Sequence, residues 1–335
     1  MKLPIETKNP LFGKYLYPPA KKIMEEQQDI FWTAQEIKVS KDIQDYRQKM
    51  SPEQLQLVTL TLQLFVEIEQ KVGEVWETIA EWFPHSEIEG ACTQIASMEK
   101  SVHAFFYQKM SDELNIDPEE IARNQQTVFV LKDKLEFLQS ITANLSKDKP
   151  LSLATVALIE QVLLFSNFAM LKSFQANGHN LIPNTITGVS FVVNDEQLHG
   201  VFASYLHNTY IEEASAGRRR FNLEGHHNNL ITLVKEIIAH EDAVIDYLFN
   251  DITSINDITS TQLKSFIRSR ANKVLVDMNF PSYYTVTDNS IADWFFQGAN
   301  SIKMHDFFVT GTNSYSRGWS LDSFSRLPYL TETSV

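Results

Sequence analysis

Cysteine and the turn-forming residues are scarce in this chain of 335 residues. Its single cysteine, Cys92, cannot form a disulfide within the chain. The eleven glycines and eleven prolines together make up roughly 7% of the residues, against about 12% in average proteins. Sandwiches and barrels with many short strands need more turn residues than this, so the composition favours a protein built from long helices.

Basic charge and long apolar runs are lacking as well. The chain has 29 Lys and Arg against 42 Asp and Glu, a formal net charge of -13, which repels polyphosphate and anionic lipid surfaces. The N-terminal sequence MKLPIETKNP has no apolar signal segment, and no run approaches the ~18 to 20 apolar residues of a membrane span. We therefore expect a soluble cytoplasmic protein that binds neither nucleic acid nor membrane. Its 43% hydrophobic content is enough for a large core, which excludes a disordered chain.

Hydrophobic periodicity predicts long helices within one domain. Apolar residues recur mostly at three- and four-residue steps, which is typical of amphipathic helices. No Gly/Ser linker separates the periodic segments, so we expect one helical domain over residues 1–310, in which residues 1–30 form an N-terminal extension. Residues 311–335 are rich in Ser and Thr, lose the periodicity, and are expected to form a flexible tail. The helices are expected at about 52–82, 86–114, 126–145, 152–176, 184–214, 228–249 and 260–277.

Acidic residues and histidines recur in order inside these apolar helices, where an uncompensated charge would be strongly unfavourable. A single Glu is followed by a Glu/His pair on the next helix, and the pattern occurs twice. This is the donor set of a dinuclear carboxylate site in a four-helix bundle. Carboxylate and imidazole donors without thiolates suit iron or manganese rather than structural zinc. The predicted ligands are Glu69, then Glu99 with His103, and Glu160, then Glu196 with His199.

Some of these positions have rivals. Glu67 competes with Glu69, but the apolar phase of residues 52–82 favours Glu69 on the buried face. Glu236 and His240 also form a Glu/His pair, yet nothing pairs with them at the right interval, so we assign them to the surface. The same surface assignment is made for the histidines at the ends of predicted helices or in loops, which are His85, His179, His226 and His227.

Three segments carry a family resemblance. FWTAQEIKVSKDIQDY at 31–46, IEQVLLFSNF at 159–168 and DEQLH at 195–199 resemble segments of the radical-generating small (beta) subunit of class I ribonucleotide reductases. The resemblance covers roughly residues 25 to 315. It implies an all-α, ferritin-like bundle, a homodimer, and a dinuclear centre that initiates radical transfer to a large alpha subunit. That large subunit would reduce ribonucleotides and be held by the C-terminal tail.

The resemblance also implies roles for individual residues. Asp195 would link Trp32 to the metal-bound His103, and Tyr315 would pass the radical to the large subunit. Tyr107 falls where many family members carry a radical tyrosine. An apolar pocket protecting the oxidised species from water would be lined by Leu164, Phe168 and Val192.

One position departs from the family pattern. The family's second helix carries its ligand Glu three residues before the His, but here Lys100 stands there and Glu99 lies one residue earlier. In an ideal helix at about 100° per residue, Glu99 lies about 40° to one side of His103 and Lys100 about 60° to the other. We favour a one-residue bulge that restores Glu99 as a ligand. The alternatives are a site that has lost one carboxylate and a Lys100 that only reaches solvent.

A lysine near the metals resembles subclass Id of the family, whose members are activated by manganese with superoxide and use the oxidised dimanganese cluster itself. Tyr107 would then hold no stable radical. Two manganese ions are therefore favoured, with two iron ions or a mixed pair as alternatives, and Lys71 competes with Lys100 as the functional lysine. Two other functions stay open. A stand-alone ferritin-like oxidase would not need Trp32 or Tyr315, and in a metal-storage or degenerate structural protein Lys100 would mark a dead site.

Overall fold

The computed structural model describes residues 2–9, 14–115, 119, 122–124, 128–143, 145, 148–216 and 221–296. The chain divides into two compact units, residues 1–301 and 302–335. The second unit lies outside the described residues, as do the predicted tail and the predicted domain boundary at 310. Within the described part, the only pairing of extended backbone is an isolated bridge between Ile255 and Ile258.

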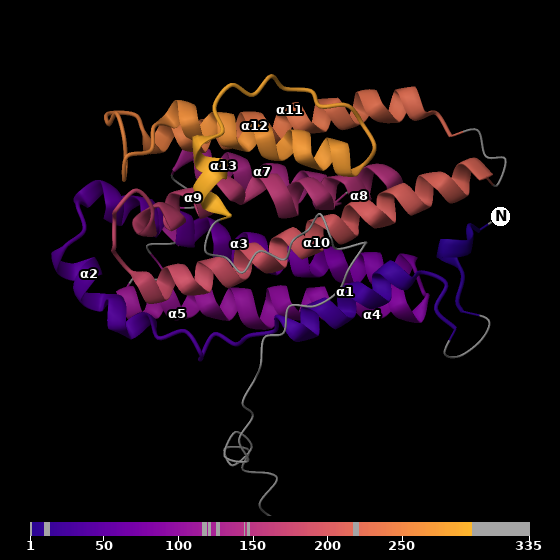
Figure 1. The fold of residues 1–335 in the computed structure, drawn as a ribbon, viewed down its shortest axis with the longest axis horizontal. Coiled ribbons are helices and arrows are strands. Elements are labelled where there is room, and N and C mark those ends of the chain that lie inside the picture. The colour runs from indigo at the N-terminus through magenta and orange to yellow at the C-terminus, as the bar shows by residue number, and fades with distance from the viewer. Residues whose placement is uncertain are drawn as a thin grey trace, which may run out of the picture. The chain divides into compact units, whose positions relative to one another are not determined.

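Helices account for nearly all of the described structure (Figure 1). Short 3-10 helices occur at Pro4–Glu6, Val39–Asp42 and Ser173–Gln175, and π-helical turns at Glu99–His103 (η3) and Ile159–Leu163 (η5). The α-helices are α1 (Pro18–Asp29), α2 (Ile43–Gln48), α3 (Pro52–Trp82), α4 (Ser86–Met98), α5 (Ala104–Leu114), α7 (Phe129–Ala143), α8 (Lys149–Leu158), α9 (Phe165–Lys172), α10 (Pro183–Ala216), α11 (Leu223–Leu248), α12 (Ser260–Asp277) and α13 (Ser290–Phe295).

Four long helical segments form the bundle that surrounds the core. They are α3, the continuous run α4–η3–α5, the run α8–η5–α9, and α10. α3 packs on α4 and α5, α10 packs on α8 and α9, and α11 pairs with α12 on the α8 side (Figure 1). The start of α3 is fixed by a capping box, in which the Ser51 hydroxyl accepts from the Gln54 N–H at 3.3 Å and the Gln54 side chain accepts from the Ser51 N–H.

All seven predicted helices are present, and the segments 52–82 and 260–277 have the predicted bounds. The structure adds α1, α2 and α13, which are too short for a clear periodic pattern. α1 lies within residues 1–30, the predicted N-terminal extension of the domain. It packs on α4 and α10 and buries Ala20, Ile23 and Gln27, so it belongs to the fold.

One helical segment, Lys149–Gln175, is long and apolar enough to cross a membrane by length and composition. The sequence prediction that no segment approaches that limit was therefore too strong. The apolar window of this segment is entirely buried inside the protein, because it is the central helix of the bundle and other helices cover it on every side. Its burial accounts for its composition.

Candidate metal centre

Six side chains that the sequence singled out meet in the middle of the bundle, and each of them is fully buried. They form two overlapping groups in which one ligand atom per residue lies within 4.8 Å of all the others. One group is Glu69, Glu99, His103 and Glu196; the other is Glu99, Glu160, Glu196 and His199. Glu99 and Glu196 belong to both groups. Since a carboxylate has two oxygens, these two residues can each serve two ions.

A π-helical turn brings Glu99 into the cluster. Residues Glu99–His103 are π-helical, and Nδ1 of His103 lies 3.0 Å from Oε2 of Glu99. A π turn contains more residues than an α-helical turn. Glu99, four residues before His103, therefore lies on the same side of the helix as His103, where an α-helix would place the residue three before it. The predicted bulge is confirmed, and the cluster keeps its fourth carboxylate.

The same turn carries Lys100 away from the cluster, which favours the alternative in which Lys100 only reaches solvent. Its stem lies along Gly73, where an added Cβ would come within 2.7 Å of Lys100 Cγ. Its Nζ pairs with Glu77 at 2.6 Å, and the Glu77 side chain is 57% exposed. Lys71 pairs with Glu74 at 2.8 Å in the same way. Neither lysine contacts any of the six clustered residues, so each one forms only an ion pair at the surface.

Lys100→Met is therefore expected to leave the metal content of the chain unchanged. The lost ion pair is exposed and contributes at most about 1 kcal/mol to stability. Elemental analysis of the metal-loaded variant checks this. A loss of bound metal would mean that Lys100 acts on the centre.

The rival acid and the control histidines are also placed. Glu69 is fully buried whereas Glu67 is exposed, as the apolar phase of α3 predicted. The surface assignment holds for Glu236, which is exposed. It was wrong for His85 and His226, which are 1% and 5% exposed. His85 is covered by Pro4 and Tyr17 and His226 by His207 and Phe280, contacts with distant segments that no local pattern indicates. His179, His227 and His240 are half-buried.

The protonation of the cluster is set by burial and by its many carboxylates. Burial, reinforced by a neighbouring carboxylate, raises the pKa of Glu69 and Glu160 well above the ordinary value. Burial alone would lower the pKa of His103 and His199, but the surrounding acids raise both well above it. Burial would also raise the pKa of Glu99, yet the charge of His103 and hydrogen bonds lower it. The cluster therefore attracts cations strongly, and protons and metal ions compete for it.

The unpaired atoms of the cluster fit a pair of metal ions. Buried polar atoms without hydrogen-bond partners are rare and costly. Seven such atoms gather here, all of them oxygens except one imidazole nitrogen, which lies near a carboxylate without hydrogen-bond alignment. Four ionised carboxylates balance the charge of two divalent ions, and the donor set suits manganese or iron. The atoms are both carboxylate oxygens of Glu69 and Glu196, Oε1 of Glu99, Oε2 of Glu160 and Nδ1 of His199.

A hydrogen-bonded chain connects the cluster to Trp32. The indole N–H of Trp32 donates to Oδ2 of Asp195 at 2.8 Å, and the same oxygen lies 3.0 Å from Nε2 of His103. The Trp32 and His103 rings are stacked, with centroids 5.9 Å apart. The link that the family resemblance implied is thus present in the geometry, and all three side chains are buried.

Two partners of the cluster were missed by the sequence reasoning. The amide nitrogen of Gln27 donates to Oδ1 of Asp195 at 3.0 Å, and its amide oxygen lies 2.9 Å from Nε2 of His199. Because Asp195 also contacts His103, Gln27 and Asp195 together connect the two imidazoles. The indole N–H of Trp76 donates to Oε1 of Glu160. Trp76 lies in the apolar stripe of residues 52–82, which by itself indicates only a core position. Gln27 gave no signal, because α1 has no clear apolar repeat.

The remaining predicted site residues are placed as follows. Tyr107 is fully buried one turn after His103 and packs against Phe65, with ring centroids 4.9 Å apart. Its hydroxyl has no hydrogen-bond partner among the described residues, and burial raises its pKa well above the ordinary value. The predicted apolar lining, Leu164, Phe168 and Val192, is fully buried, and Phe168 also packs against Phe65, with ring centroids 4.8 Å apart. Tyr315 lies outside the described residues.

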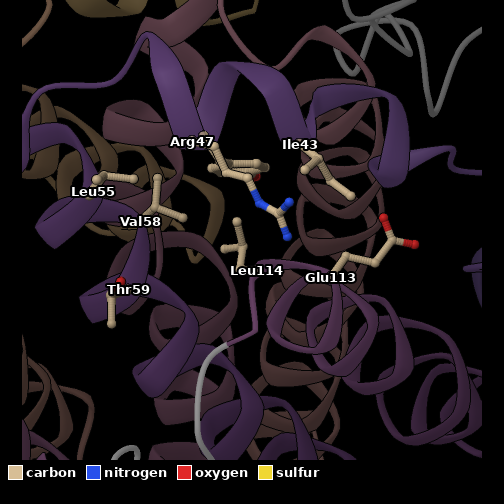
Figure 2. Close-up of a pocket in the computed structure, with 8 residues that line it drawn as sticks. Ile43, Arg47, Leu55, Val58, Thr59, Glu113 and Leu114 are labelled. Atoms are coloured by element: carbon tan, nitrogen blue, oxygen red, sulfur yellow. The ribbon is translucent and has the colours of Figure 1, made fainter.

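A pocket of about 230 Å³ opens elsewhere, between α2, α3 and α5 (Figure 2). Figure 2 shows the Arg47 side chain between Leu55 and Val58 on one side and Ile43 and Glu113 on the other. None of the six clustered residues lines it. The candidate centre is therefore packed into the core and is not reached through this pocket.

Comparisons with known proteins agree with this geometry. The profile of the family described as "Ribonucleotide reductase, small chain" matches residues 12–290. The chain is 24% identical over 303 residues to the ribonucleoside-diphosphate reductase subunit beta of Bacillus subtilis, covering 86% of this chain and 85% of the relative. It is 25% identical over 324 residues to the corresponding subunit of Treponema pallidum, covering 91% and 87%.

Solved structures have the same fold. The dimanganese(II) NrdF of Streptococcus sanguinis superposes with a TM-score of 0.69 at 21% identity, covering 84% of this chain and 95% of that one. The ribonucleotide reductase R2 subunit of Clostridium botulinum superposes with a TM-score of 0.72 at 16% identity, covering 83% and 88%.

Proposed function

This chain belongs to the ribonucleotide reductase small-chain family, and from that premise we propose that it is the beta subunit of a class I ribonucleotide reductase. The observation that carries the proposal is the buried chain of contacts from Trp32 through Asp195 to His103. A metal store or a stand-alone oxidase needs the six donors but has no use for a tryptophan hydrogen-bonded to a ligand's partner. A subunit that transfers a radical to a partner subunit needs both the six donors and the hydrogen-bonded tryptophan.

Two metal ions fit the two overlapping groups of donors. Glu69 and His103 would hold one ion, Glu160 and His199 the other, and Glu99 and Glu196 would be shared. When oxidised, such a centre supplies the one-electron oxidising equivalent that starts radical transfer. We favour two manganese ions, with two iron ions or a mixed pair as alternatives. The oxygen and imidazole donors suit each of these, and the Streptococcus sanguinis neighbour is a dimanganese(II) protein.

The surrounding residues orient the ligands and define the route. The contact between Asp195 and Nε2 of His103 leaves Nδ1 of that ring facing the carboxylates, which fixes the imidazole as a ligand. The N–H of Trp32 is held on the same carboxylate, so oxidation of the indole can be coupled to movement of its proton toward Asp195. Leu164, Phe168 and Val192, which are fully buried, would protect the oxidised species from water.

We propose that the chain acts as a homodimer and binds a large alpha subunit through residues 311–335, with Tyr315 passing the radical across. Deletion of residues 316–335 is then expected to abolish ribonucleotide reduction in the presence of the large subunit. Metal content should be unchanged, because every donor lies between Glu69 and His199. The measurement is turnover of the truncated and full chains at equal metal loading. Unchanged turnover would contradict docking through the tail.

A further inference from the structure

The helix that carries Glu160 contains a π-helical turn whose free carbonyls are bound by buried cations. In a π turn the backbone hydrogen bonds shift by one residue, so carbonyl groups are left without their usual partner. Nε of Arg270 donates to the carbonyl of Gln161 at 3.2 Å, and Nζ of Lys134 donates to the carbonyl of Leu163 at 2.8 Å. Arg270 and Lys134 are 6% and 0% exposed.

Arg270, on α12, differs from Lys134 in having no ion-pair partner. Lys134 pairs with Glu241 at 2.5 Å, whereas no carboxylate within ion-pair distance faces Arg270 among the described residues. Burial lowers the pKa of Arg270 to about 10. Burying a guanidinium without a counter-charge is destabilising. Charge pairing therefore does not explain why Arg270 is buried here.

The contacts of Arg270 concentrate on the residue next to Glu160. Besides the carbonyl of Gln161, Arg270 binds the side chain of the same residue, with Nη2 donating to Oε1 at 2.9 Å. The Gln161 side chain in turn lies against Gly200, where an added Cβ would come within 2.3 Å of Gln161 Cγ. Gly200 follows His199 directly. One guanidinium therefore holds both the backbone and the side chain of a residue packed between two predicted ligands of the same ion.

The other face of Arg270 is held by aromatic rings. Its guanidinium carbon lies 4.3 Å from the centroid of Phe165 and 5.3 Å from that of Phe296. Phe296 is the C-cap of α13, and α13 and α12 both pack on α9 (Figure 1). Stacking against rings partly compensates a desolvated cation. The result is a rigid joint between the last described helix and the turn that carries Glu160.

We infer that Arg270 is a positioning residue for the ion bound by Glu160 and His199. It fixes the π turn at Gln161 and thereby holds the Glu160 carboxylate in the cluster. The inference rests on the proposed metal centre. The first of its two tests measures metal binding, and the second is made without metal. Glu160 belongs to only one of the two donor groups, so the effect should be confined to one ion.

The first test is titration of the metal-free full chain with Mn(II), comparing Arg270→Met with the wild type. The affinity for one ion should fall about 10- to 100-fold, as is typical when a group that orients a ligand is lost, and the affinity for the other should be unchanged. Arg270→Lys, which cannot reach both oxygens of Gln161, should lie between. Arg268→Met is the matched control, because Arg268 is on the same helix but pairs with Asp242 near the surface. It should bind both ions like the wild type.

The second test is hydrogen exchange of the metal-free chains. Arg270→Met should speed exchange of the amides of residues 159–165 and leave those of the other π turn, 99–103, unchanged. Gln161→Leu keeps the contact of Arg270 with the backbone carbonyl and should speed amide exchange at 159–165 by a smaller amount. It replaces Arg270→Met in this test if that variant fails to fold. Equal weakening of both ions, or unchanged exchange at 159–165 in both variants, would overturn the positioning role. A wild-type chain that binds no Mn(II) would overturn the proposed centre while leaving the exchange result to decide on Arg270.

Discussion

Glu196→Ala is expected to remove both metal ions. Its carboxylate is the one acid on α10 that belongs to both donor groups, and neither of its oxygens has a hydrogen-bond partner among the described residues. Loss of a shared ligand should cost each ion more than the ~10- to 100-fold typical of a residue that only orients a ligand. Elemental analysis after loading with manganese and with iron should fall from about two ions per chain, as a dinuclear site of this kind holds, to almost none.

Two variants control this result. Glu67→Ala removes an exposed acid two residues from Glu69 on the same helix, so it should leave the metal content at the wild-type level. Glu160→Ala removes a ligand of one group only, so it should mainly affect one ion. If Glu196→Ala kept two ions per chain, the shared role of this carboxylate would be wrong.

Trp32→Phe is expected to abolish ribonucleotide reduction while the metal content stays the same. The substitution keeps an aromatic ring in the buried site but removes the N–H that donates to Asp195 at 2.8 Å, and phenylalanine is much harder to oxidise than tryptophan. We expect turnover with the large subunit to fall to the background level measured without bound metal. The measurement compares turnover and metal content of the same preparations.

Trp82→Phe is the matched control for this variant. Trp82 is a half-buried tryptophan at the end of α3, where it touches neither Asp195 nor any of the six clustered residues. It should leave turnover unchanged. If Trp32→Phe had wild-type turnover at equal metal content, radical transfer from the centre would not pass through Trp32.

Most of the fold was predictable because its helices are long and amphipathic. The buried stripe of α3 gave both the helix and the choice of Glu69 over Glu67. The π turn at Glu99–His103 was predictable because Glu99 stands one residue earlier, relative to His103, than in the family that the sequence resembles, and a one-residue bulge compensates for that difference. The second π turn, at Ile159–Leu163, left no such conflict in the sequence, because a single Glu has no partner on its own helix to set a spacing.

The missed parts of the site depend on contacts between distant segments. Gln27 reaches Asp195 across 168 positions of sequence, and Arg270 reaches Gln161 across 109. Neither residue stands in a local pattern that separates it from a surface residue. The position of Lys100 was left open for a related reason. In an ideal helix its side chain can approach the cluster, and the π turn that brings in Glu99 turns it outward to Glu77.

Ribonucleotide reduction by the metal-loaded chain together with its large subunit tests the central claim most directly. Deoxyribonucleotide formation should require both chains and should stop when the metals are removed from this one. A chain that binds two metal ions yet supports no ribonucleotide reduction, while oxidising small molecules in the absence of the large subunit, would contradict that claim.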